Sequence, residues 1–212
     1  MTEQNYHICL DHVLKSEGGY INDPDDTGGP TNMGVTLRNF RKYVMPHAEI
    51  DDLKKLTREQ AATVYRQHYW NAVRANELPN GLDYAMFDFA VNSGPTRAIK
   101  FLQRIVGTAQ DGRLGPDTMK VATTRDTGYL IDTLCSDRLD WYKRLHNWSK
   151  FGKGWNKRIA YVRTYATQMA LEQKKTMLER VLPKKLQPKK EAPPPPPKRR
   201  KGKSYRTFGW KS

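Results

Sequence analysis

The sequence predicts a mainly α-helical fold, and three of its features carry that prediction. Apolar residues recur every three or four positions in most segments, which is the spacing of one face of a helix. No apolar–polar alternation continues long enough to indicate a strand of useful length. Glycine and proline fall between the periodic segments, where helices end. With 212 residues, the chain can build one sizeable domain, or a compact two-lobed one, around a real core.

The first third of the chain is expected to hold helices on either side of an irregular stretch. Residues 5–17 carry an apolar stripe, and Gly18-Gly19 ends this helix because glycine readily takes the left-handed conformation. Residues 19–35 are rich in Gly, Pro and Asp, which predicts turns around a short hairpin. Further helices are expected over residues 36–45 and 57–68, the second opened by a capping box from Thr57 to Gln60.

The remainder of the chain is expected to be helical up to Pro183. The predicted helices cover residues 81–92, Pro95 to Val106, 117–123, 128–147 and 156–181. Residues 151–155, which contain two glycines, are expected to join the last two of them. Cys9 and Cys135 each lie in a helix-like stretch with apolar neighbours, so buried free thiols are expected rather than a disulfide.

The formal charge of +15 is concentrated at the C-terminal end. Residues 183–212 hold eight Lys, three Arg and one Glu, a net +10, which leaves +5 for the rest of the chain. Five consecutive prolines, 193–197, favour an extended spacer, and we expect the tail to be disordered. Its basic and aromatic residues suit an anionic membrane or envelope surface, although charge alone also allows nucleic acid or simple solvation.

The N-terminal residues show no signal peptide, and the chain contains no run of 18 apolar residues. We therefore expect the chain to be made in a cytoplasm. If its substrate lies outside, another component must deliver it.

Glu17 is the strongest candidate for a catalytic residue. At the close of the first predicted helix, its carboxylate faces the negative end of the helix dipole, which disfavours the charged form. A carboxyl group that keeps its proton near neutral pH can donate it to a leaving oxygen. The glycines that follow let a large substrate approach, and Asp23, Asp25 and Asp26 lie close by in the sequence. Glycoside cleavage usually needs one proton donor and a second carboxylate across a cleft.

Three ordered motif blocks resemble glycoside hydrolase family 108, a family of phage endolysins and related bacterial muramidases. The first block consists of Glu17-Gly18-Gly19-Tyr20, Asn22-Asp23-Pro24, Asp26, Gly28-Gly29, Thr31 and Gly34-Val35-Thr36. The others resemble the predicted peptidoglycan domain that follows in this family, and they include Asn92-Ser93-Gly94, Leu102-Gln103, Asp111 to Thr118 and the closing segment Phe151 to Arg158. Val35 and Pro30 are mild departures from the family's usual Ile and Ala. Together the blocks cover residues 8 to about 160.

The resemblance implies a lysozyme-like fold, with residues 1–92 as the catalytic part and 93–182 as the peptidoglycan domain part of one unit. It implies an N-acetylmuramidase that hydrolyses the β-1,4 bond between N-acetylmuramic acid and N-acetylglucosamine, with Glu17 as the essential acid. For the second carboxylate our order of preference is Asp26, then Asp23, then Asp25. Phage-type lysozymes of another family space their Glu, Asp and Thr much like Glu17, Asp26 and Thr31, but the Asp-to-Thr interval here is one residue shorter.

Several polar and aromatic side chains are candidates for substrate contacts. The candidates are Tyr20, Asp23, Thr31, Asn32, Asn92 and Gln103. For Asn92 and Gln103, helix capping and surface solvation are equally open. No cofactor is expected and no metal: the calcium-like segment from Asp23 has Gly34 where a bidentate Glu is required at the twelfth position.

The expected biological role is that of a monomeric phage endolysin that reaches bacterial peptidoglycan through a holin or a secretion system. Two rivals are a lytic transglycosylase, which also uses a single Glu, and a non-catalytic peptidoglycan-binding protein. A third is a basic nucleic-acid binder, which would depend on the tail.

Overall fold

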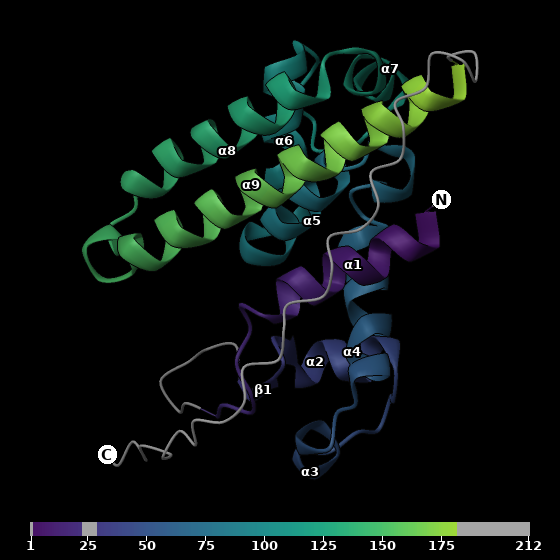
Figure 1. The fold of residues 1–212 in the computed structure, drawn as a ribbon. Coiled ribbons are helices and arrows are strands. Elements are labelled where there is room, and N and C mark those ends of the chain that lie inside the picture. The colour runs from purple at the N-terminus through teal and green to yellow at the C-terminus, as the bar shows by residue number, and fades with distance from the viewer. Residues whose placement is uncertain (1, 23–28, 182–212) are drawn as a thin grey trace, which may run out of the picture.

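The computed structural model describes residues 2–22 and 29–181, and it is mainly α-helical over these ranges (Figure 1). The Pro-rich basic tail expected over residues 183–212 lies outside the described residues, as does the segment 23–28. The helices are, in chain order, α1 (Thr2–Leu14), α2 (Leu37–Tyr43), α3 (Ile50–Lys54), α4 (Arg58–Tyr65), the π-helical η1 (Arg66–Trp70), the 3-10 helix η2 (Ala75–Glu77), α5 (Leu82–Ser93), α6 (Pro95–Val106), α7 (Pro116–Thr124), α8 (Thr127–Lys143) and α9 (Trp148–Val181).

The irregular stretch after α1 contains the short hairpin that the sequence predicts. Strand β1 (Thr31–Asn32) pairs antiparallel with β2 (Val35–Thr36), and Ile21 forms an isolated bridge to Thr31. The hairpin turn consists of Met33 and Gly34, both with positive φ, at 47° and 71°. Two left-handed residues give a turn whose twist matches that of the strands, which is why glycine is favoured in it.

Helix α5 occupies the centre of the fold, and its residues Leu82 to Ala90 are all buried. It packs against α6, α8 and α9 on one side, and against α1, η1 and η2 on the other. Figure 1 shows α8 and α9 side by side above α5, and α1 between them and the α2–α4 region. A single hydrophobic core therefore runs from the first helix to the last.

Several predicted elements are confirmed by the described helices. Thr57 caps α4, and its hydroxyl and the side chain of Gln60 form the expected capping box. Gly94 and Pro95 separate α5 from α6 as predicted. Cys9 and Cys135 are buried free thiols, and burial raises the pKa of Cys135 to about 11. No helix in the two described ranges is both long and apolar enough to cross a bilayer.

Other predictions about the helices were wrong. The first helix ends at Leu14, not at residue 17. The break expected over residues 151–155 is absent, since α9 continues from Trp148 to Val181. The reason is local packing: Gly152 lies so close to the Trp148 ring that a Cβ there would be 2.6 Å from Cε2, which leaves room only for glycine in the helix. The short helix α3 was not predicted.

Candidate active site

Glu17 follows the end of α1 in a tight turn. The backbone N–H groups of Ser16 and Glu17 donate to the carbonyls of Val13 and Leu14, at 2.9 and 3.2 Å, so the chain closes with short turns instead of another α-helical turn. Only 20% of the Glu17 side chain is exposed. The carboxyl group is therefore largely enclosed, yet still reachable from solvent.

The turn of the β-hairpin and Tyr65 from α4 form one wall around the Glu17 carboxyl group. The Tyr65 hydroxyl donates to the Met33 carbonyl at 3.0 Å. A Cβ at Gly34 would lie only 2.8 Å from Oε2 of Glu17, so the carboxyl group packs directly on the turn. Burial and the negative charge of Glu17 raise the pKa of both Tyr65 and Tyr69, so both hydroxyls stay protonated beside it.

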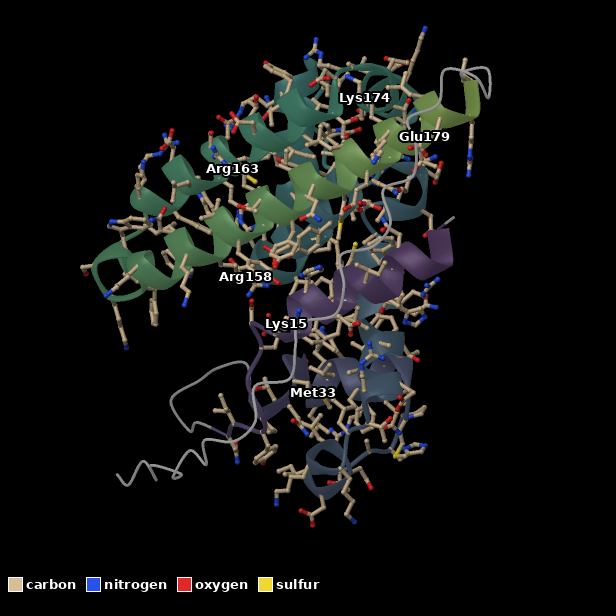
Figure 2. All side chains as sticks on the ribbon, in the orientation of Figure 1. Lys15, Met33, Arg158, Arg163, Lys174 and Glu179 are labelled. Atoms are coloured by element: carbon tan, nitrogen blue, oxygen red, sulfur yellow. The ribbon has the colours of Figure 1, made fainter. Side chains whose placement is uncertain are left out.

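Arg158 forms the opposite wall. Figure 2 shows this residue projecting from α9 towards the end of α1, where Lys15 is labelled. Its Nη1 donates to Oε1 of Glu17 at 3.1 Å, and its Nε donates to Oδ1 of Asp88 on α5 at 2.9 Å. A guanidinium group therefore contacts Glu17 directly, which the sequence did not indicate.

Asp88 connects this pair to a second buried arginine. Its Oδ2 accepts from Nη1 of Arg138 at 2.7 Å, and both side chains are only 2% exposed. Nε of Arg138 donates to the Tyr142 hydroxyl at 3.1 Å, and that hydroxyl donates to Oδ1 of Asn92. Two arginines thus balance two carboxylates in a chain of contacts that joins α5, α8 and α9 to Glu17.

The residues predicted to contact substrate lie in different parts of the structure. Asp23 and Asp26, with Asp25, lie outside the described residues. Thr31 is in β1 next to the hairpin turn, and Tyr20 is half-buried with the Lys54 ammonium 5.6 Å from its ring centre. Asn92 belongs to the chain of contacts just described, which brings it into connection with Glu17.

The Asn32 and Gln103 amides are already hydrogen-bonded within the protein. Asn32 is buried, and its Nδ2 donates to the carbonyls of Leu53 and Lys54 at the end of α3. Gln103 is 1% exposed; its amide nitrogen donates to Asp111 and to the Arg113 carbonyl, and its oxygen accepts from the Gly112 N–H. Both side chains thus fix the position of a neighbouring segment.

Sequence reasoning did not assign a role to Arg158, Asp88, Arg138 or Tyr65. Arg158 was noted only as part of the closing motif, and its partner lies 141 positions away. One signal was available: Asp83 and Asp88 are the only acidic residues in the otherwise apolar segment 82–90, and a buried carboxylate needs a partner. Nothing in the sequence indicated which cations these would be. Within residues 2–22 and 29–181, no three His, Cys, Asp or Glu side chains converge as a metal site would require.

This arrangement defines the class of protein. The mainly α fold with a small β-hairpin after the first helix is lysozyme-like, and the half-buried Glu17 between the two is its candidate catalytic group. Residues 10–94 match the family model Glycosyl hydrolase 108, and residues 97–160 match the model described as Predicted Peptidoglycan domain. Among solved structures, the chain is similar to Brucella abortus SagA, with 40% identity over 79% of this chain and 97% of that chain and a TM-score of 0.71. No curated protein matches it.

The chain therefore belongs to the glycosyl hydrolase 108 family. Its activity is that of a glycoside hydrolase, and its partner is peptidoglycan. Glu17 lies in the segment matched by the hydrolase model and Arg158 in the segment matched by the peptidoglycan model, so the ion pair at the site joins the two.

Proposed function

We propose that this protein is an N-acetylmuramidase that hydrolyses the β-1,4 bond between N-acetylmuramic acid and N-acetylglucosamine, with Glu17 as the general acid. The observation that carries the proposal is the enclosure of Glu17 between Arg158 and the Met33–Gly34 turn. A carboxyl group held from two sides keeps its geometry while the remaining exposed fifth of its side chain faces substrate.

Glu17 donates its proton to the glycosidic oxygen as the bond to that oxygen breaks. When a sugar ring covers the carboxyl group, loss of water favours the neutral, proton-donating form. Arg158 keeps Asp88 as its partner during this step, so protonation of Glu17 does not leave a buried cation alone.

The second carboxylate is proposed to be Asp26, with Asp23 and Asp25 as the next candidates. It stabilises the oxocarbenium-like state or activates water. A separation of about 5–5.5 Å between the two carboxyl groups would indicate retention of the anomeric configuration, and one of about 6.5–9.5 Å would indicate inversion. Tyr20, Thr31 and Asn92 are proposed as substrate contacts, together with Asp23. We propose that Asn32 and Gln103 act indirectly, because their amides hold neighbouring segments of the chain in place.

We propose that the protein acts as a monomeric endolysin, made in a cytoplasm and delivered to the cell wall by a holin or a secretion system. The tail, residues 183–212, is proposed to attach it to an anionic membrane or envelope surface through its net charge of +10. A chain truncated after Pro183 that clears sacculi as fast as the full chain would exclude nucleic-acid binding by the tail as the main role.

The test is digestion of purified sacculi with the wild type and with Glu17→Gln, followed by mass spectrometry of the products. The expected result is products with reducing ends, a mass increase of one water per bond cleaved, and a loss of activity of at least about a thousandfold in Glu17→Gln. Glu59→Gln, an exposed carboxyl on α4, is the matched control and should keep full activity. Anhydro-sugar products would indicate a lytic transglycosylase. Binding without cleavage by the wild type would indicate a non-catalytic peptidoglycan-binding protein.

A further inference from the structure

A pocket lies where α5 ends and α6 begins, and it takes no part in the proposed mechanism. Its volume is about 510 Å³, and it is lined by residues 93–97 and by side chains of α6 and the loop after it. Three lining side chains, Arg97, Lys100 and Arg104, are cations, and none of the described residues that line it is a carboxylate. A pocket with this lining attracts an anion.

Arg97 is held in place by contacts that leave its charge available. The Arg97 guanidinium lies 4.5 Å from the centre of the Trp141 ring, and its Nη1 donates to the Ser93 carbonyl at 3.0 Å. Within the described part of the chain, no carboxylate pairs with Arg97 or Lys100. Arg104 differs, since its Nη2 lies 2.9 Å from Asp137. Two unpaired cations therefore face the pocket beside one that is paired.

The pocket is connected to the catalytic region through α5. The Ser93 hydroxyl, at the pocket's edge, lies 2.8 Å from the Tyr142 hydroxyl, which belongs to the chain of contacts that ends at Glu17. Asp88 and Ser93 are five residues apart on this helix, roughly 7.5 Å along its axis. Contacts through α5, α8 and α9 thus link the edge of the pocket to Glu17.

Peptidoglycan offers an anion that suits the pocket. Its acetylated sugars are uncharged once the lactyl group is amide-linked to the peptide, so the free carboxylates of a strand are those of its peptide stems. We propose that the pocket of Arg97, Lys100 and Arg104 binds a free carboxylate of the peptide stem on the strand that Glu17 cleaves. The inference rests on the proposed function. It implies that the protein segment matched to the peptidoglycan model recognises the peptide stem and not the sugar alone.

Two measurements on the full chain test the pocket. The first is calorimetric titration with the free stem tetrapeptide and with the same peptide amidated at its carboxyl groups. Wild type should bind the free peptide, and Lys100→Glu should weaken this binding by about tenfold, because repulsion replaces attraction. Lys175→Glu, the same charge change at an exposed position of α9, should bind like wild type.

The second measurement compares hydrolysis of intact strands with that of strands whose stem carboxyl groups have been converted to amides. Wild type should show a lower KM on intact strands, Lys100→Glu should lose that preference, and both should hydrolyse the amidated strands equally. The proposal is overturned if the amidated peptide binds as well as the free one, if Lys175→Glu has the same effect, or if inorganic phosphate displaces the peptide at equal concentration. If wild type cleaves neither kind of strand, the proposed function fails, while the titration still decides whether the pocket binds the peptide.

Discussion

Nη1 of Arg158 lies 3.1 Å from Oε1 of Glu17, and this contact links residues that are 141 positions apart. The same guanidinium also contacts Asp88 in the central helix, so the glutamate is oriented from the core of the protein and not only by its own turn. The segment matched to the peptidoglycan model therefore contributes directly to the geometry around Glu17, the proposed general acid.

Arg158→Ala should lower kcat by about tenfold to a hundredfold with little change in KM, because Glu17 loses the contact that orients it. Arg163→Ala is the control, because Arg163 lies on the same helix but pairs with the exposed Asp132. A lower melting temperature with an unchanged kcat would show that Arg158 has only a structural role.

Gly34→Ala should reduce activity strongly, because its Cβ would lie 2.8 Å from Oε2 of Glu17 and also meet the Tyr65 hydroxyl. Gly29→Ala is a matched control: Gly29 has the same φ of 71°, but no atom of the described residues lies within 4 Å of its Cβ position. Both variants should lose about 1–2 kcal/mol of stability from the left-handed conformation, as measured by urea denaturation. Only Gly34→Ala should lose hydrolysis of sacculi beyond this shared effect. Equal activity in the two variants would contradict the direct contact between the turn and Glu17.

The helical character of the chain was predictable, because it depends on local sequence. Apolar spacing and the Thr57 capping box predict helices from neighbouring residues alone. The prediction of a break at residues 151–155 was wrong, because glycine is only a weak signal for the end of a helix. Gly152 is required there by its packing against the Trp148 ring, which the sequence pattern does not show. The partners of Asp88 were not predictable, since Arg138 and Arg158 reach it from helices that only the folded chain brings together.

Asp88→Asn should lower the free energy of unfolding by about 3–5 kcal/mol, because it leaves two buried guanidinium groups without their shared carboxylate. Asp137→Asn is the control: it removes an ion pair with Arg104 at a more exposed position and should cost less than about 1 kcal/mol. Urea denaturation of both variants measures the difference. A cost for Asp88→Asn no larger than that for Asp137→Asn would contradict the assigned role of the buried chain.

Asp83 should make the stability of the protein fall as the pH rises towards 7. Burial raises the pKa of this carboxyl group from 3.8 to about 7, although the N–H groups of Gly81 and Tyr84 and the Asn5 amide all donate to it. Between these two pH values the folded protein holds a proton that the unfolded chain releases. The stabilising contribution is therefore complete below about pH 4 and is lost as the pH rises through 7.

The measurement is the free energy of unfolding of wild type and of Asp83→Asn, by urea denaturation from pH 4.5 to 8. The difference, wild type minus variant, should decrease across this range by on the order of 2–4 kcal/mol, because titration of all other groups cancels in the comparison. Asp51→Asn is the control: a hydrogen bond and the charge of Lys54 lower the pKa of this exposed carboxyl group, so its contribution is lost only as the pH falls below about 4. Its difference curve should stay flat from pH 4.5 to 8, and a flat or rising curve for Asp83→Asn would show that Asp83 is ionised in the folded protein throughout this range.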